Sequence, residues 1–205
     1  MSYPLDEKSL LHFLESRRSQ RQFGRGEVNQ DVVEEVVQAA GWAPSPHKTR
    51  PWRFVAVSSP AARRNLVLKM GEAFDADLKR DGLSDERRWA RIKKSHDLLL
   101  AASVLIVACI SMEKMDRYPD PPRRTAEETM AAQSLGAAAQ NILLAAHAKG
   151  IAACWVCAPL FCPQVVHRTL DLPLDYVAQA LLALGPLPSE VPPPRPPYQL
   201  TVLHR

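Results

Sequence analysis

The spacing of apolar residues predicts two amphipathic helices near the start of the chain. The first follows Asp6, a capping residue, and its apolar face is formed by Leu10, Leu11 and Leu14. The second follows Asn29, which we expect to cap it. Its stripe has the i, i+3, i+4, i+7 spacing and consists of Val33, Val36, Val37 and Ala40.

Short apolar runs predict four strands of a buried sheet, and helices are expected between them. The strands are Arg53–Ser58, Val104–Ala108, Ala152–Val156 and Val177–Leu184. Helices are expected over residues 60–70, over the charged stretch 73–94 with a break near Gly82, and over residues 163–170. The charged stretch is interpreted as a solvent-facing excursion. A proline-rich tail follows Gly185, and a short strand pattern covers residues 198–203.

A long helix rich in small residues is predicted at the centre of the fold. Thr125 and Glu128 have the spacing of a capping box, and Gly150 follows the helix, which ends at Lys149. The order of elements predicts an α+β fold, a three-layer α/β/α arrangement with a central mixed sheet. We expect one domain over residues 1–205, with residues 186–205 as a C-terminal extension.

Composition narrows the possible partners. The 205 residues carry a net charge of +4, and 46% of them are hydrophobic, which is typical of a globular domain. The basic residues are scattered and no nucleic-acid-binding signature is present, so no nucleic-acid partner is expected. The longest apolar stretch, Leu98–Ile110, is too short to span a membrane, and the first residues do not form a signal peptide pattern. We therefore expect a cytoplasmic protein.

The cysteines and histidines do not predict a metal site or a catalytic triad. Four cysteines are too few for a disulfide framework. Cys154-x-x-Cys157 with Cys162 supplies three thiols but no convincing fourth ligand. We therefore expect no metal and assign no catalytic side chain.

A basic octamer, Ser16–Phe23, directly follows the first helix. It contains Arg17, Arg18 and Arg21, together with the hydroxyl of Ser19. Guanidiniums bind phosphate through several charge-assisted hydrogen bonds, so this octamer is a candidate phosphate site. The alternative is a solvated basic turn.

A second candidate is the proline-punctuated loop that ends at Trp52. His47, Lys48 and Arg50 lie between Pro46 and Pro51, which restrain the backbone. The cationic side chains would suit an anionic ligand. The alternative is that Lys48 and Arg50 pair with surface acids.

Together the octamer, this loop and the segment 150–160 resemble the nitroreductase family of FMN-dependent oxidoreductases. Arg17-Arg18-Ser19, Pro44-Ser45 with Pro51-Trp52, and Trp155 after the long helix carry the resemblance. The loop, Asp81-Gly82-Leu83, Tyr118-Pro119-Asp120 and Cys154-Trp155 look more closely like the reductase domain of a two-domain actinobacterial enzyme that matures a deazaflavin coenzyme. The glutamate-ligating domain of that enzyme has no counterpart in this chain.

This resemblance implies roles for individual residues in a homodimer. The small residues of the helix 125–149 and the lack of a hydrophobic cluster in the tail after Gly185 predict that both pack across a two-fold interface. The FMN phosphate would be held by Arg17, Arg18, Ser19, Arg21 and, from the tail, Arg195. The flavin ring would be contacted by Pro44, Ser45, Pro46 and His47 of the neighbouring subunit, and by Trp155, Val156, Cys157 and Ala158. Common family members carry Asn and Gln where Lys48 and Arg50 stand, so these two residues are candidates for binding the substrate. The C-terminal tail would extend onto the partner subunit.

The implied function is hydride transfer through flavin N5 to an electron-poor or unsaturated acceptor. One candidate acceptor is a dehydro precursor of the deazaflavin coenzyme, with NAD(P)H as an electron donor. Two alternatives remain open: a general NAD(P)H-dependent nitro or quinone reductase, and a flavin- or deazaflavin-binding protein without turnover. Flavin chemistry requires no catalytic triad, because the cofactor carries the reaction.

Overall fold

The computed structural model describes residues 6–190 and 200–203 and contains one four-stranded sheet. Its spatial order is β1 (Trp52–Val57), β2 (Val104–Ile110), β4 (Val177–Pro186) and β3 (Ile151–Val156). All three pairs of neighbouring strands are antiparallel. The expected mixed sheet is therefore wrong for the described residues, whereas the α+β class is confirmed.

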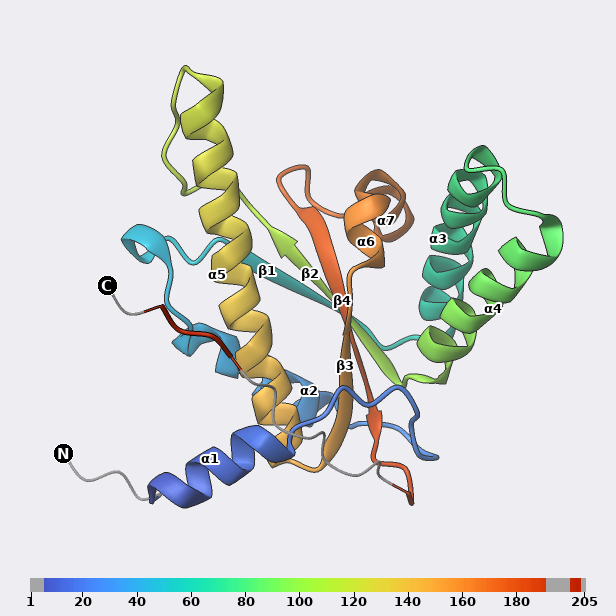
Figure 1. Cartoon of the computed structure of the whole chain (residues 1–205), viewed down its shortest axis with the longest axis horizontal. Helices are drawn as coiled ribbons and strands as arrows, with labels where there is room; N and C mark the ends of the chain where they lie inside the picture. The colour runs from blue at the N-terminus through green and yellow to red at the C-terminus, as the bar shows by residue number, and fades with distance from the viewer. Residues whose placement is uncertain (1–5, 191–199, 204–205) are drawn as a thin grey trace.

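Helices cover both faces of the sheet, which confirms the three layers (Figure 1). One face carries α2 (Gln30–Gln38) and α5 (Pro121–Ala148). The other carries α3 (Pro60–Arg80) and α7 (Pro163–Leu170), with α4 (Asp85–Ala101) packed on α3. The central strand β2 is buried on both faces because alternate side chains enter the two cores.

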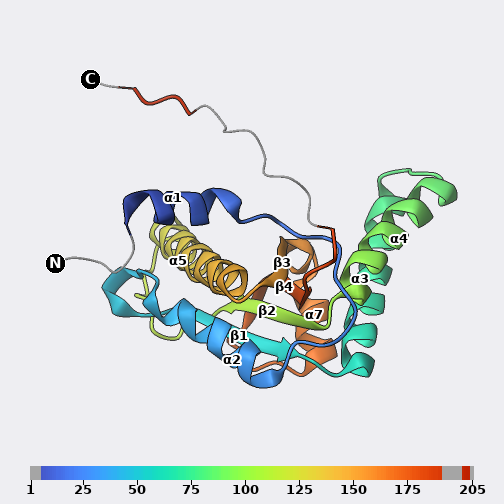
Figure 2. The ribbon, with the colours of Figure 1, turned by 90° about the horizontal axis from the view of Figure 1, so that it is seen from below.

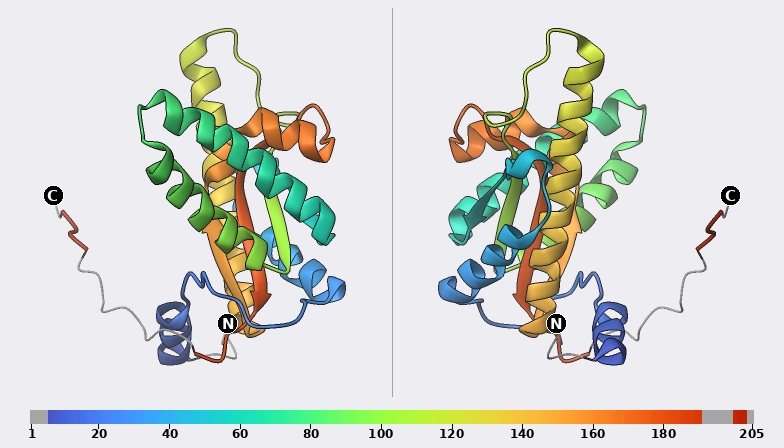
Figure 3. Two further views of the ribbon diagram at one scale, coloured as in Figure 1. Left: turned by 90° about the vertical axis from the view of Figure 1, so that its right-hand side faces the viewer. Right: turned by 90° about the vertical axis from the view of Figure 1, so that its left-hand side faces the viewer.

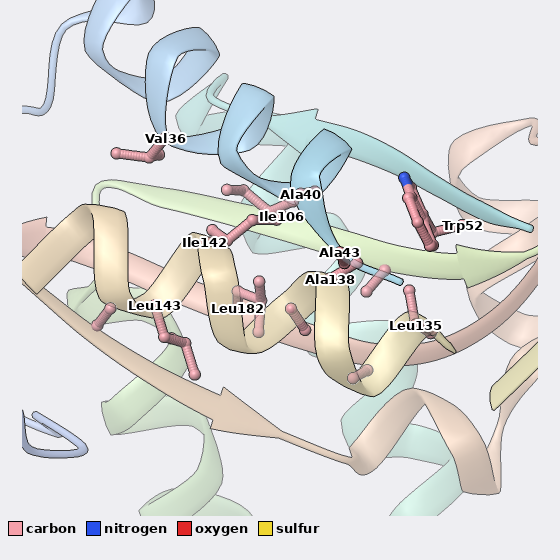
Figure 4. Packing of buried hydrophobic residues seen from close by; sticks show 14 of the residues in the cluster. Val36, Ala40, Ala43, Trp52, Ile106, Leu135, Ala138, Ile142, Leu143 and Leu182 are labelled. Atoms are coloured by element: carbon pink, nitrogen blue, oxygen red, sulfur yellow. The ribbon is translucent and has the colours of Figure 1, made fainter. Parts of the chain in front are cut away.

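Small residues bring α5 close to the sheet, as their number predicted. Ala138 and Ile142 of this helix are fully buried and belong to one cluster with Ile106 and Leu182 of the two central strands (Figure 4). A helix with alanines on its inner face can approach a sheet closely without leaving voids. The helix ends as expected, with Gly150 at φ 68° just beyond the C-cap Lys149.

The start of α5 corrects the predicted capping box. The helix begins at Pro121, and its N-cap is Asp120, whose Oδ1 accepts a hydrogen bond of 3.1 Å from the Arg123 N–H. Prolines in the first turn of a helix lose no intrahelical hydrogen bond, so Pro121 and Pro122 favour this earlier start. The residues around Thr125 are thus inside the helix.

We expect Asp120→Ala to lower the free energy of unfolding by about 1 kcal/mol, because an unsatisfied backbone N–H replaces the cap. Thr125→Ala should have a much smaller effect, since its side chain caps nothing. Urea unfolding of both variants measures the difference. A larger loss from Thr125→Ala would restore the capping box.

The first helix, α1 (Glu7–Ser16), lies against α5 and buries none of its own residues (Figure 2). Its predicted cap is confirmed, because the Ser9 N–H donates to Asp6 Oδ1 over 3.0 Å. Asn29 occupies the N-cap position of α2 but makes no side-chain cap bond, so that part of the prediction is wrong. Leu10, Leu11 and Leu14 remain 46%, 49% and 45% exposed.

The charged stretch forms a hairpin of α3 and α4 that lies over one face of the sheet (Figure 3). Helix α3 runs further than predicted, and Gly82, at φ 76°, makes the turn between the helices. Arg88 of α4 ties the hairpin by donating to Asp75 of α3 over 2.8 Å.

Three short helices and the tail complete the described residues. Two 3-10 helices, η1 (Ala39–Trp42) and η2 (Pro46–Lys48), precede β1, and α6 (Ala158–Phe161) follows β3. Of the strand expected over residues 198–203, the described part, 200–203, forms no strand. Among the helices of the described residues, none has the length and apolar character needed to cross a bilayer.

Candidate functional site

The basic octamer is hydrogen-bonded to β3, the strand at one edge of the sheet. The Gln20 N–H donates to the Ala153 carbonyl of β3 over 2.9 Å, and Gln20 itself is buried. At its end, the Phe23 ring packs on Gly185, where an added Cβ would come within 2.7 to 2.9 Å of that ring and its Cβ. The octamer therefore contacts β3 through Gln20 and the neighbouring strand β4 through Phe23, which a fully solvated turn would not do.

A small pocket of about 130 Å³ opens beside the octamer. Arg17 and Arg18 line it together with Gln20, Ala153 of β3, and His147 near the end of α5. Two arginines thus line the pocket where α1, β3 and α5 meet, and guanidiniums are donors that a phosphate group can use.

Sequence reasoning missed His147, which links α5 to the octamer. Its Nε2 lies 2.9 Å from Ser16 Oγ, and its ring centroid is 5.1 Å from that of Phe13 in α1. Burial, and then the positive charge of Arg17, lower the pKa of His147 below its ordinary value of 6.5. His147 is the histidine three residues before the helix-ending glycine, but no motif marked it.

We expect His147 to make the protein less stable in acid. Because its folded pKa is lowered, the unfolded chain takes up a proton that the folded protein resists as the pH falls through about 6.5. The free energy of unfolding should decrease from there down to the folded pKa, and His147→Gln should remove this component. Urea unfolding between pH 5 and 8 measures it, with His12→Gln on α1 as the control. Identical pH slopes for the wild type and His147→Gln would contradict the assignment.

The other two octamer residues lie outside this pocket. Ser19 and Arg21 are exposed, and Arg21 lies close enough to β3 for its charge to act on Cys154. The pKa of Cys154 is nevertheless raised, because burial outweighs the charge. Arg195 is outside the described residues.

The end of β3 presents the segment predicted to contact a flavin ring. Trp155 and Val156 are half-buried, Cys157 is exposed, and Ala158 begins α6. The indole N–H of Trp155 donates to Cys157 Sγ over 3.1 Å, and its ring lies beside Gly136 of α5. The described residues contain no group of three metal-ligating side chains placed to hold an ion.

The proline-punctuated loop has an unusual backbone. His47, Lys48 and Arg50 have φ values of 50°, 57° and 48°, in the left-handed region that non-glycine residues rarely adopt. Ser45 Oγ accepts from the Arg50 N–H over 3.1 Å, and Thr49 Oγ1 donates to the Pro46 carbonyl over 2.8 Å. These bonds hold a strained conformation that projects the cationic side chains into solvent.

Within a single chain, this loop and β3 lie at opposite edges of the sheet. The loop leads into β1 at one edge of the sheet, and β3 is at the other edge. Three strand spacings, about 14 Å in total, separate the edges, and α5 covers the face between them. The predicted site residues thus form two half-sites.

The model of the family described as "Nitroreductase family" matches residues 14–186, which include both half-sites. The chain belongs to the nitroreductase family. The sequence-based family assignment is therefore confirmed, together with an oxidoreductase class of enzyme.

Individual relatives agree with this assignment. The 5,6-dimethylbenzimidazole synthase of Rhodospirillum rubrum is 30% identical over 172 residues, which cover 82% of this chain and 77% of that protein. An Archaeoglobus fulgidus protein named as an NADH dehydrogenase/NAD(P)H nitroreductase is 30% identical over 177 residues, covering 85% and 83%.

Solved structures share the fold. A nitroreductase with bound FMN from Bacteroides fragilis has a TM-score of 0.73 at 21% identity, and the match covers 98% of this chain and 100% of that one. A BluB-like flavoprotein from Clostridium difficile has a TM-score of 0.74 at 22% identity, covering 92% and 94%. The nitroreductase fold of this chain is thus confirmed.

Proposed function

We propose that this protein is an FMN-dependent oxidoreductase that transfers hydride between a nicotinamide donor and an electron-poor or unsaturated acceptor. The observation that carries the proposal is the hydrogen bond from Gln20 of the octamer to Ala153 of β3, next to the pocket that Arg17 and Arg18 line. The family match, the FMN named for fold neighbours and the NAD(P)H named for a relative support the same chemistry.

The residues present fit FMN. The 130 Å³ pocket suits a phosphate, with Arg17 and Arg18 as its cationic lining. Ser19 and Arg21 stand next to it on the exposed side and would complete the phosphate shell. The tail residue Arg195 is proposed to join them.

A second copy of the chain would complete the site. The loop with Pro44, Ser45, Pro46 and His47 is at the far edge of its own sheet, so it is proposed to contact the ring bound by the neighbouring subunit. The exposed leucine stripe of α1 supports a homodimer, because none of its residues is buried within one chain. The tail is proposed to extend onto the partner.

We expect the purified protein to have twice the mass of one chain in light scattering at micromolar concentration, with an interface larger than about 2,000 Å². Replacing Leu10 and Leu14 by lysine should shift it towards the monomer, because the charges oppose burial of this face. Leu68→Lys, an equally exposed position on α3, is the matched control. A monomeric wild type would contradict the proposal.

When bound, FMN supplies the chemistry by taking up and passing on a hydride at N5. The chain's own groups position the reactants. A backbone N–H in residues 155–158 is proposed to hydrogen-bond N5, and the half-buried Trp155 fixes that segment against α5. The strained loop would cover the ring and exclude water from it.

The acceptor is proposed to be anionic, with a deazaflavin precursor as the candidate. Lys48 and Arg50 are exposed, and neither side chain forms an ion pair within the described residues. The ion pairs of the described residues therefore give no support to the alternative that Lys48 and Arg50 pair with surface acids. A neutral flavin ring does not require these charges, whereas a phosphorylated or glutamylated acceptor would use them.

Spectra and turnover test the function. The protein should bind FMN, NADH or NADPH should bleach the bound flavin, and an electron-poor acceptor should reoxidise it. Binding without bleaching would indicate a carrier, and absence of flavin binding would overturn the proposal. Because one relative is a 5,6-dimethylbenzimidazole synthase, the assay should also look for that product. Turnover of a quinone, but not of a deazaflavin precursor, would indicate a general NAD(P)H-dependent reductase.

A further inference from the structure

A second pocket, away from the octamer, lies beside the N-terminal part of α5. Its volume is about 590 Å³, the size of a small-molecule site. It is lined by the segment that follows β2, by the start of α5 and by residues at the start of β4: Met112, Glu113, Asp116, Arg117, Tyr118, Arg124, Glu127, Glu128, Asp175 and Val177. None of these residues belongs to the proposed flavin site.

At the bottom of this pocket is a buried carboxylate. Glu127 is only 3% exposed and lies on the core-facing stripe of α5 with Ala131 and Leu135. Its Oε2 is fully buried and has no hydrogen-bond partner among the described residues. The helix dipole stabilises a negative charge only in the first turn of a helix. Glu127 lies beyond the first turn of α5, so its carboxylate does not benefit from the dipole.

Within the described residues, no arginine or lysine forms an ion pair with Glu127. Arg124 Nη1 donates to the Pro119 carbonyl over 3.0 Å, and Arg123 stacks on the Tyr118 ring at 4.6 Å. Asp175 is engaged differently, because its Oδ2 accepts from Ser111 over 2.5 Å. A buried carboxylate without a donor is costly, and a bound cation that donates to it would offset this cost.

We propose that this pocket binds an organic dication, an aliphatic diamine whose ammonium group donates to the carboxylate of Glu127. The lining contains five carboxylates and two guanidiniums, and Glu113 also pairs with Arg53 over 3.8 Å, which leaves an excess of two negative charges. The carboxylates do not converge as metal ligands do, since no group of three is placed to hold an ion among the described residues. Dispersed charges instead match an extended cation, and Met112 and Val177 offer apolar contact to its methylenes.

Calorimetry of the full-length protein with 1,4-diaminobutane at low salt tests the proposal, and neutral 1,4-butanediol is the matched ligand. We expect saturable binding of the diamine only, and Glu127→Gln should weaken it at least about tenfold, the scale of one charged hydrogen bond. Glu86→Gln, an exposed change in the first turn of α4, should leave binding unchanged.

Thermal unfolding without ligand completes the test. Glu127→Gln should be at least as stable as the wild type, because the amide removes an unpartnered buried charge. A less stable variant that also loses the dimer would show that a group of the second copy pairs with Glu127, and would overturn the proposal. Equal binding of diol and diamine, unchanged diamine binding by Glu127→Gln, or an equal loss in Glu86→Gln would overturn it as well.

Discussion

Replacing Arg17 by alanine should weaken FMN binding by roughly ten- to 150-fold, about 1.5–3 kcal/mol, the contribution of a charged hydrogen bond. Arg17 lines the pocket beside the octamer, and its charge acts on His147, which lines the same pocket. Removing it takes away a cation from a concave site, where a surrounding protein screens the phosphate less than water does.

Riboflavin separates this role from a general effect on the fold. It lacks the phosphate, so its affinity should change little in Arg17→Ala, and flavin fluorescence titrations measure both ligands. Arg25→Ala is the matched control, because Arg25 is exposed just beyond the octamer. Equal losses for FMN and riboflavin would remove the phosphate assignment. A large loss in Arg25→Ala would indicate diffuse electrostatic attraction instead.

Most of the fold could be predicted from local patterns. The 3.6-residue period located α1 and α2, and the apolar run of β2 correctly indicated a buried strand. Strand direction could not be predicted, because an apolar run of this kind is usual for parallel strands. Here the helices cover both faces of an antiparallel sheet, so β2 is equally buried.

The start of α5 and the roles of His147 and Glu127 could not be predicted from local patterns. The spacing of Thr125 and Glu128 predicted a capping box, whereas the helix begins at Pro121, where two prolines follow the N-cap Asp120. His147 and Glu127 are defined by what packs around them, from segments far away in the sequence. The octamer was recognisable because its chemistry is contiguous, whereas the pocket of Glu127 is assembled from three separate segments.

The loop before β1 is the site of the second change for which we expect a large effect. Its backbone was expected to be stiffened by Pro46 and Pro51, but the left-handed conformations of His47, Lys48 and Arg50 could not be inferred from sequence. Each such residue costs about 1–2 kcal/mol relative to a relaxed conformation. Strain of this kind is found at binding sites, which supports a role for the loop in recognition.

Changing Lys48 to Asn and Arg50 to Gln together should lower affinity for a phosphorylated or glutamylated deazaflavin by roughly tenfold or more for each lost charged contact. Both side chains are exposed and lack ion-pair partners within the described residues, so the change should cost little stability. FMN should stay bound, because its phosphate site is at the other edge of the sheet. Reduction of a neutral quinone should continue.

The matched control moves two equivalent charges away from the loop. Arg64→Gln with Lys79→Asn on α3 removes the same net charge from exposed positions, and it should leave deazaflavin binding unchanged. Deazaflavin fluorescence titrations at two salt concentrations compare the three proteins, since a direct contact survives moderate salt better than long-range attraction does. Equal losses in both double variants would show that net charge alone attracts the ligand. If the Lys48, Arg50 double variant binds as tightly as the wild type, the loop does not recognise the acceptor and the proposed deazaflavin substrate loses its support.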